Sequence, residues 1–205
     1  ISTGDDGIHA DSKITINDST INIKESYEGI ESNYIIINNG TINVVSTDDG
    51  INVNGGSDNS SQGRMGSNTL SSDTSNLCLE INGGSLYVNS SGDGLDSNGS
   101  IKMTSGTVYV DGPTDDGNGA IDYNNTFTLT GGTLIAAGSS GMAQNVSSST
   151  QNSVIIYFSN TQSAETKVTV GDISYTPSKS FSSIVISSPS LVSNKSYTVL
   201  LNNNT

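Results

Sequence analysis

Short runs in which apolar and polar residues alternate recur along most of the chain, separated by Gly, Asn, Asp and Ser. This period of two, together with the abundance of Ile and Val, predicts β-strands rather than helices. The runs form units that repeat about every 22 residues, which is typical of a solenoid because one such unit cannot bury its apolar face alone. The units span residues 4–23, 27–44, 48–54 continued at 79–88, 92–110 and 115–136.

Alignment of the units places aliphatic residues in vertical columns, one of which is Ile8, Ile30, Ile51, Leu95 and Ile121. Short strands with Gly, Asn and Asp at the corners, three to a unit, predict a parallel β-helix with about 22 residues per rung. The preferred hand of parallel crossovers favours a right-handed coil. The expected fold is therefore all-β, a right-handed parallel β-helix.

We expect residues 1–205 to form a single solenoid domain. Residues 1–136 would supply the regular rungs, interrupted at 55–76 by a Gly/Ser/Asn-rich insertion that predicts a loop. From 137 to 205 strand-like runs continue without the repeat. They predict irregular last rungs and a β cap over the open end of the solenoid, where strand edges would otherwise be unpaired.

The chain carries 7 basic against 20 acidic residues, a formal net charge of −13. This balance excludes nucleic acid and an anionic membrane surface as partners, and no apolar run is long enough to insert into a membrane. Cys78 is the single cysteine, so there is no internal disulfide. We expect a monomer that is secreted or held at a bacterial cell surface, with an export signal or further sequence upstream of Ile1.

An acidic motif recurs at the start of each unit. The second motif position holds Asp6, Glu28, Asp49, Asp93 and Asp116, and a glycine follows each of them. Rungs stack about 4.8 Å apart, so neighbouring carboxylates would repel by on the order of 3 kcal/mol at an effective dielectric near 20. Lys13, Lys24 and Lys102 fall at other positions of the rung. The row therefore requires a bound cation, unless the acids are protonated or simply solvated.

Oxygen ligands without a His/Cys cluster favour calcium over zinc or copper. His9, in the column that follows the aliphatic position, is interpreted as a solvent-facing residue rather than a ligand. The predicted calcium ligands are Asp5, Asp6, Glu28, Glu31, Asp48, Asp49, Asn52, Asp93, Asp96, Asp115, Asp116 and Asp122.

The repeated DDGI, EGIE, DDGIN and GDGLDSNGSI segments, with the C-terminal SIVISSPSLVSNKSYTV, resemble a known family. They are similar to secreted, clostridial-type carbohydrate-binding β-solenoids, which are related in fold to family 9 pectate lyases. The resemblance implies a right-handed parallel β-helix with calcium sites that binds cellulose and acidic plant sugars such as polygalacturonate. It also implies that a lyase would place a lysine base just behind the calcium motif. The corresponding positions here are Ala10, Ser32, Val53, Ser97 and Tyr123.

Because β-elimination needs a base as well as calcium, the sequence favours a non-catalytic calcium-binding carbohydrate-binding protein over a pectate lyase. For the lyase alternative, Lys102 and Arg64 are the residual base candidates. A third alternative is a cell-surface adhesin, ice-binding or other structural solenoid, suggested by the column Thr20, Thr41, Ser85, Thr107 and Thr133.

A neutral glucan would need an aromatic platform, and the chain has no tryptophan. Tyr87 and Tyr109 occupy the outward position of the third strand on adjacent rungs. Exposed aromatic rings stack on sugar rings, although paired tyrosines also stabilise sheets. We therefore take Tyr87 and Tyr109, with Arg64 of the insertion, as candidate carbohydrate-binding residues.

Overall fold

The computed structural model describes residues 1–54 and 76–202. The predicted loop at 55–76, including Arg64, lies almost entirely outside this range. The described chain is all-β, and it contains no helix long and apolar enough to cross a membrane.

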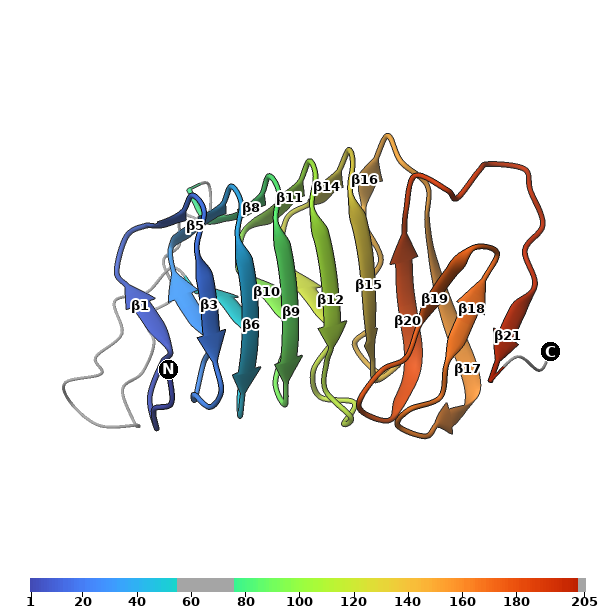
Figure 1. The fold of residues 1–205 in the computed structure, drawn as a ribbon, viewed down its shortest axis with the longest axis horizontal. Helices are drawn as coiled ribbons and strands as arrows, with labels where there is room; N and C mark the ends of the chain where they lie inside the picture. The colour runs from blue at the N-terminus through green and yellow to red at the C-terminus, as the bar shows by residue number, and fades with distance from the viewer. Residues whose placement is uncertain (55–75, 203–205) are drawn as a thin grey trace.

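Three parallel sheets form the walls of a β-helix (Figure 1). The first sheet contains β1 (Ile8–Ala10), β4 (Ile30–Ser32), β7 (Ile51–Val53), β10 (Leu95–Ser97) and β13 (Ile121–Tyr123). The second contains β2 (Ile14–Ile16), β5 (Tyr34–Ile37), β8 (Cys78–Ile81), β11 (Ser100–Met103), β14 (Phe127–Leu129) and β16 (Ser148–Ser149). The third begins with β3 (Thr20–Ile23), β6 (Thr41–Ser46), β9 (Ser85–Ser90), β12 (Thr107–Asp111) and β15 (Thr133–Gly138).

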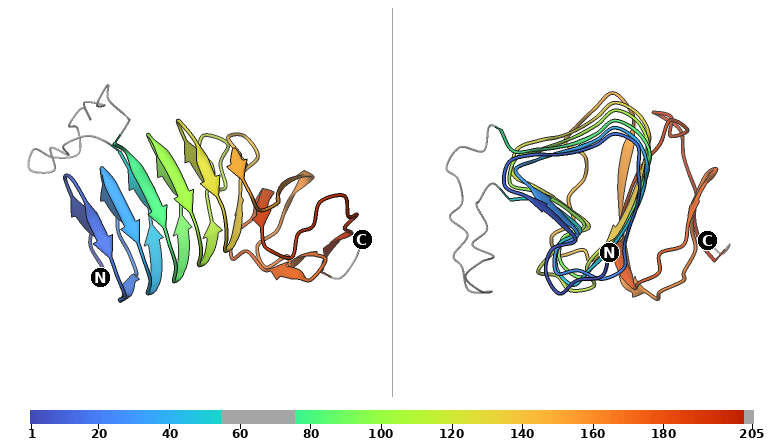
Figure 2. Two further views of the ribbon diagram at one scale, coloured as in Figure 1. Left: turned by 90° about the horizontal axis from the view of Figure 1, so that it is seen from above. Right: turned by 60° about the vertical axis from the view of Figure 1, so that its left-hand side comes forward.

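The register confirms the column predicted from the sequence. Ile8 pairs with Ile30, Ile30 with Ile51, Ile51 with Leu95, and Leu95 with Ile121. The strands of the third sheet run downwards on the near side while the coil advances from left to right, so the helix is right-handed (Figure 1). Seen along the axis, the coils superimpose on one three-sided outline (Figure 2).

Side chains that alternate inward along each strand fill the interior of the coil. Ile30, Ile51, Leu95, Val88 and Val110 are all fully buried. Since side chains on a strand alternate between two faces, a slip by one residue would turn each apolar set outward. The interior packing therefore fixes the register of the acidic motif, which lies immediately before the first strand of each coil.

The C-terminal region is built differently from the coils. In the third sheet, β20 (Phe181–Ser187) pairs antiparallel with β15, and β17 (Ser153–Gln162) pairs antiparallel with β20. A separate cap sheet contains β18 (Val168–Val170), β19 (Ile173–Tyr175) and β21 (Val199–Leu201). The cap sheet lies beside the outer face of the third sheet (Figure 2). A second apolar cluster, which includes Ile135, Ile184, Phe181 and Val168, fills the space between them. The C-terminal β cap is confirmed: it packs against a side of the solenoid, and β20 pairs with the edge strand β15.

Asp111, at the end of β12, joins the cap to the solenoid. Its side chain is 2% exposed. Oδ1 accepts a hydrogen bond from the Tyr175 hydroxyl at 2.8 Å. Oδ2 accepts from the Tyr87 hydroxyl at 2.8 Å and from the Ser178 amide and hydroxyl at 3.0 and 2.6 Å. Four donors thus satisfy a buried carboxylate that connects two layers.

Candidate metal centre

Backbone hydrogen bonds between coils hold the acidic motif in line. The amide of Gly7 donates to the Glu28 carbonyl at 2.9 Å, that of Gly29 to Asp49 at 2.9 Å, and that of Gly50 to Asp93 at 2.8 Å. Asp6, Glu28, Asp49 and Asp93 therefore stack from coil to coil, as the sequence predicts.

The glycine of the motif is required by the close approach of neighbouring coils. A Cβ added at Gly29 would lie 2.1 Å from the Gly50 carbonyl oxygen and 2.2 Å from a methyl group of Val44. A side chain here would push the coils apart. The glycine thus allows the acids on successive coils to approach within interaction range.

The predicted place of Asp116 in the acidic row is wrong. In the fifth coil Gly94 donates to the Gly119 carbonyl and Leu95 to Ala120, so Gly119 occupies the acidic position and Ala120 the glycine position. The two extra residues of this motif form a loop that carries Asp116 out of the row. The Asp116 side chain is exposed, and its Oδ1 accepts a hydrogen bond from the Gly141 amide at 3.0 Å. Asp115 is also exposed, and it accepts from the Gly117 amide.

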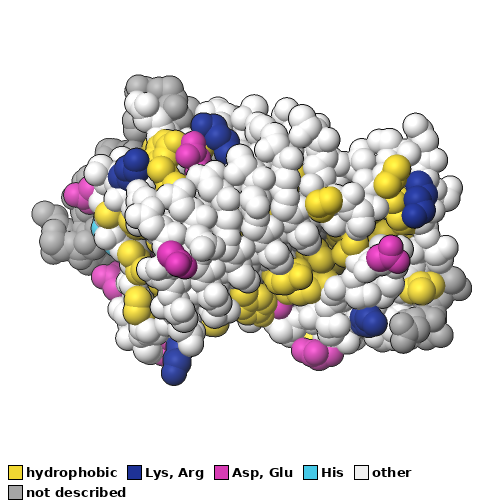
Figure 3. Space-filling model, turned by 45° about the horizontal axis from the view of Figure 1, so that its top comes forward, with side chains coloured by type: hydrophobic (Ala, Val, Ile, Leu, Met, Phe, Trp, Pro, Cys, Tyr) yellow, Lys and Arg dark blue, Asp and Glu magenta, His cyan; other side chains and the backbone are white. Residues whose placement is uncertain are grey.

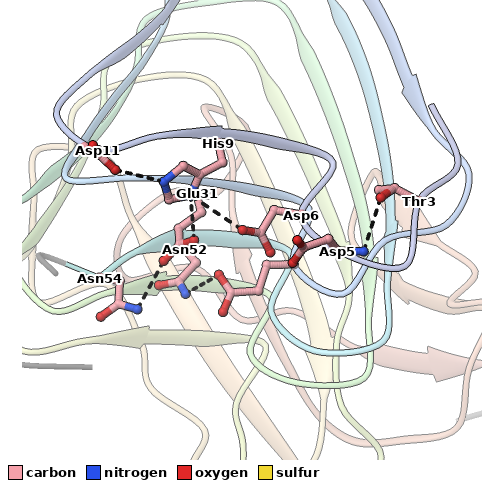
Figure 4. A network of polar contacts seen from close by, with 9 residues as sticks. Thr3, Asp5, Asp6, His9, Asp11, Glu31, Asn52 and Asn54 are labelled. Atoms are coloured by element: carbon pink, nitrogen blue, oxygen red, sulfur yellow. Dashed lines mark hydrogen bonds and ion pairs between the residues drawn. The ribbon is translucent and has the colours of Figure 1, made fainter. Parts of the chain in front are cut away.

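The acids form two groups. The first, here called the N-terminal cluster, consists of Asp6, His9 and Glu31 (Figure 4). His9 Nδ1 lies 2.9 Å from Glu31 Oε2 and 3.5 Å from Asp6 Oδ2. Asn54 Nδ2 donates to Glu31 Oε1 of this cluster at 3.2 Å, and Asn52 Nδ2 donates to the nearby Glu28 Oε2 at 2.5 Å. Nitrogen donors from this protein therefore already face most of these carboxylates. The position of His9 beside two acids differs from the solvent-facing role expected of it.

The second group, here called the central cluster, consists of Asp93, Asp96 and Asp122, whose nearest carboxylate oxygens all lie within 4.8 Å of one another. Asp49 adjoins it, because its Oδ1 accepts from the Asp93 amide at 2.7 Å. Asp93 Oδ1 accepts from the Gly119 amide at 2.5 Å, and Asp122 Oδ1 accepts from Gln144 Nε2 at 2.5 Å. The charged neighbours of Asp96 are the carboxylates of Asp49, Asp93 and Asp122. This arrangement of oxygens could hold a metal ion.

Burial and mutual repulsion raise the pKa of these acids well above the ordinary range. Partial burial, followed by the charges of neighbouring carboxylates, raises the pKa of Asp96 to about 8 and that of Asp49 to about 7. Burial raises the pKa of Asp93 to about 6 despite the Gly119 hydrogen bond. The same causes raise the pKa of Glu28 to about 9 and that of Asp6 to about 6. A bound cation would remove this penalty by compensating the charge.

Asn52 supplies an independent sign of a missing partner. It lies on β7 between Glu31 of β4 and Asp96 of β10, and it is 3% exposed. Its Nδ2 points at Glu28, whereas its carbonyl oxygen Oδ1 is buried and has no donor among the described residues. An unpaired buried oxygen costs about 1–3 kcal/mol. A cation beside the carboxylates would satisfy it.

The remaining predicted ligands lie at the margin of these clusters. Asp48 is partly buried, and its charge raises the pKa of both Asp49 and Asp93. Asp5 is exposed at the open end of the coil. The face in Figure 3 consists mostly of uncharged polar side chains and backbone, with a band of hydrophobic side chains and scattered charged ones.

The two candidate sugar-binding tyrosines lie beneath the cap. The Tyr109 ring stacks on Tyr175 with centroids 4.9 Å apart and planes 7° apart. The Tyr87 hydroxyl donates to Asp111. The cap thus covers one face of Tyr109 and uses the polar end of Tyr87, so a sugar would have to displace cap residues to stack there. Arg64 lies outside the described residues.

The structure also places residues that the repeat pattern did not identify. Gln144 donates to Asp122 of the central cluster. Lys179, from the cap, donates to the Ser90 carbonyl, and burial lowers its pKa while Asp111 and Asp115 act to raise it. Lys102, the base candidate of the lyase alternative, lies on the second sheet and pairs with Glu80 at 3.1 Å. Gln144 and Lys179 follow the last repeat, so alignment of the units could not identify them.

No protein-family model, curated protein or solved structure matches this chain. The family resemblance of the repeat motifs stays a prediction, and the argument for function comes from the geometry of the acidic row.

Proposed function

We propose that this protein binds calcium at the central cluster and uses the ion to hold acidic polysaccharides without cleaving them. The observation that carries the proposal is the packing of Asp93, Asp96 and Asp122 within 4.8 Å, with Asp49 alongside. Among the described residues, no lysine or arginine forms an ion pair with these four acids. A cation is the simplest partner for such a concentration of negative charge.

Calcium suits the ligands better than a transition metal. The central cluster offers carboxylate oxygens, and the unpartnered Asn52 Oδ1 lies on the neighbouring strand. Calcium takes six to eight oxygen ligands in flexible geometry, whereas zinc and copper prefer nitrogen and sulfur. The N-terminal cluster has an imidazole and internal amide donors, so it is the weaker calcium candidate.

The charge of the protein indicates how an acidic polymer would be held. A net charge of −13 repels a polyuronate, unless a cation bridges the two sets of carboxylates. The motif acids lie in line across successive coils, which gives the site the linear form of an extended polymer. A linear cation site supports acidic sugars of the polygalacturonate type as the ligand. Because such polymers lie outside the cell, the proposal includes a secreted or cell-surface location.

The lack of a basic side chain in the strand positions behind the motif favours binding of the polymer over its cleavage. The strand positions behind the motif are Ala10, Ser32, Val53, Ser97 and Tyr123, which provide no strong base. Lys102 is on another sheet and is paired with Glu80. Removal of the proton next to a uronate carboxylate needs a base within reach of that proton. A calcium site without one would retain the polymer intact.

The test is retention of the protein on insoluble polygalacturonate, in calcium or in chelator, with absorbance of unsaturated uronates followed in the supernatant. We expect calcium-dependent retention that the Asp93→Asn/Asp96→Asn double variant loses, and no new absorbance. The matched control is Asp18→Asn, which removes one exposed charge at a distant corner. Retention that is equal in chelator would refute calcium bridging. Accumulating unsaturated products would establish a lyase instead.

A further inference from the structure

The N-terminal cluster combines two carboxylates with the single histidine of the chain. His9 Nδ1 lies 2.9 Å from Glu31 Oε2 and 3.5 Å from Asp6 Oδ2, and the three ligand atoms all lie within 4.8 Å of one another. Asp6 and His9 belong to the first coil, whereas Glu31 belongs to the second. An ion bound by all three side chains would therefore join these two coils.

Both nitrogens of the His9 ring face carboxylates. Nδ1 faces Glu31 and Asp6, and Nε2 lies 3.2 Å from Oδ1 of Asp11. A neutral imidazole has one N–H and one lone pair, so it can donate a hydrogen bond on one side only. If Nε2 donates to Asp11, the Nδ1 lone pair points at two carboxylates. A cation at Nδ1 would satisfy these three acceptors, and a second ring proton is the alternative.

Outer hydrogen bonds hold the ligand atoms in place (Figure 4). Asn54 Nδ2 donates to Glu31 Oε1 at 3.2 Å, so the other oxygen, Oε2, is the one that faces His9. Asp11 lies against the opposite side of the His9 ring. Metal-binding histidines usually donate their second ring N–H to a carboxylate or carbonyl, and metal-binding carboxylates are themselves hydrogen-bonded. The cluster thus has the outer contacts of a metal site as well as its ligand atoms.

A buried oxygen without a donor lies on the adjoining strand. Asn52 of β7 pairs with Glu31 of β4, so both side chains point to the same face of the sheet. Asn52 Nδ2 donates to Glu28 of the second coil, so the carboxamide is turned toward the coil that carries Glu31. Its Oδ1 is buried and has no donor within the described part of the chain. This oxygen could be a fourth ligand, and the central cluster with Asp49 has four carboxylates without it.

The donor set favours zinc over calcium. Calcium takes six to eight oxygen ligands, whereas this cluster offers one imidazole and two carboxylates. Zinc binds histidine nitrogen and carboxylate oxygen at about 2.0–2.2 Å, in a tetrahedron whose corners lie roughly 3.4 Å apart. The distances of 2.9 and 3.5 Å from His9 Nδ1 lie on either side of that spacing. The side chains of Asp6 and Glu31 are 9% and 6% exposed and that of His9 is 26% exposed, so an ion would enter beside the ring.

We propose that the N-terminal cluster binds one zinc ion through His9 Nδ1, Asp6 and Glu31, and that this ion stabilises the first coil against the second. Among the described strands β1 pairs with β4 alone, and Ile8 is half-buried where Ile30 is fully buried. A metal cross-link between β1 and β4 would compensate for this weaker packing. The site goes beyond the proposed calcium function, because it shares no residue with the central cluster.

The first experiment is calorimetric titration of zinc into the untagged full chain after removal of metal. We expect one zinc ion per chain to bind in a manner that depends on His9, with affinity weakened about tenfold or more by His9→Ala and by Glu31→Gln. The matched control is Asp96→Asn, two strands further along the same row, which should change zinc affinity by less than about twofold. Equal zinc affinity in the wild-type protein and His9→Ala would overturn the proposal.

The His9 ring gives a direct readout in the wild-type protein, so the test does not depend on a variant that folds. Because the chain has one histidine, its ring nitrogen signals in an NMR spectrum are unambiguous. Zinc should move the Nδ1 signal to the position of a metal-bound nitrogen. It should also slow hydrogen exchange of the Gly7 and Ile8 amides, which donate to the second coil.

A protonated Nδ1 whose signal zinc leaves unchanged would assign the contact to a second ring proton and overturn the proposal. Exchange of the Gly7 and Ile8 amides that zinc does not slow would overturn the stabilising role. Calcium binding is measured in a separate titration and depends on other residues. Failure of zinc to bind would therefore leave the calcium-dependent function standing, and loss of calcium binding would leave the zinc site standing.

Discussion

Asp111 and Asp96 lie on the same coil, yet their carboxylates have opposite surroundings. Asp111 is buried between the third sheet and the cap and accepts hydrogen bonds from Tyr87, Tyr175 and Ser178. Asp96 is partly buried on the first sheet and is surrounded by further acids. Burial raises the pKa of Asp96, and the charges of Asp49, Asp93 and Asp122 raise it further.

The difference in surroundings identifies Asp111 as a structural acid and Asp96 as a candidate metal ligand. A buried carboxylate with a full set of donors stabilises the fold around it, because its removal leaves those donors unpaired. A carboxylate held among like charges destabilises the fold until a cation arrives. The two kinds of acid should therefore respond to mutation with opposite signs.

The largest effect is expected from Asp111→Ala. This change leaves the hydroxyls of Tyr87 and Tyr175 and the Ser178 amide without their acceptor, so we expect a loss of about 3–5 kcal/mol in the free energy of unfolding. The melting temperature, followed by circular dichroism in excess calcium, should fall by roughly 10 °C. Asp18→Ala, at an exposed corner, is the control and should change it little. A fall no larger than that of the control would show that Asp111 does not anchor the cap.

The next effect concerns pH in the absence of cations. Folded pKa values of about 6 for Asp93, 7 for Asp49 and 8 for Asp96 lie above the unfolded value of about 4. The protonated acids therefore favour the folded state, and this stability, complete below about pH 4, is lost progressively as the pH rises from about 4 to about 8. In chelator the melting temperature should drop by several degrees across that range, and calcium should diminish the drop. A melting temperature that rises with pH in chelator would contradict the assignment.

A smaller effect of opposite sign to that of Asp111→Ala is expected from Asp96→Asn. Above about pH 8, where Asp96 is ionised, the amide removes one charge from the central cluster, so in chelator the protein should gain about 1 kcal/mol and melt roughly 2–4 °C higher. The same variant should lose most of the stabilisation that calcium provides. Asp18→Asn again serves as the matched control. Destabilisation in chelator would mean that Asp96 is a structural acid like Asp111.

The smallest effect is expected from Asp116→Ala. Because the fifth motif places Gly119 rather than Asp116 in the acidic row, calcium affinity should change by less than about twofold. Titration of calcium into this variant and into Asp93→Ala would measure the contrast. Comparable losses of calcium affinity in the two variants would show that Asp116 is a ligand of the cation site.

The regular coils could be predicted because their signals repeat. The alternation around Ile30, Ile51 and Leu95 fixes both the strand and its inward face, and the constant period fixes which residues stack. The same alignment located Asp96 beside Asn52, which the register confirms. In these columns the residues that align in the repeat are also the residues that pair between coils, so the sequence pattern alone predicts the contacts.

The fifth motif and the cap could not be predicted in this way. The segment from Asp115 to Ala120 contains two glycines. Alignment of Asp116 with the acids of the other units assigns Gly117 to the glycine position. The hydrogen bonds between coils instead place Gly119 at the acidic position and Ala120 at the glycine position. The antiparallel return of β20 onto β15, and the contact of Ser178 with Asp111, join segments far apart in sequence with no repeat to relate them. Gln144 reaches Asp122 from this same non-repeating region.

Calorimetric titration of calcium into chelator-treated wild-type protein, near neutral pH, tests the central claim most directly. The account predicts saturable binding with a Kd of about 10⁻⁴–10⁻³ M, the range of extracellular calcium modules, and its loss in the Asp93→Asn/Asp96→Asn double variant. Binding should also raise the melting temperature of the wild-type protein alone. An absence of saturable heat, with a melting temperature unchanged by calcium, would show that the acidic row is not a calcium site.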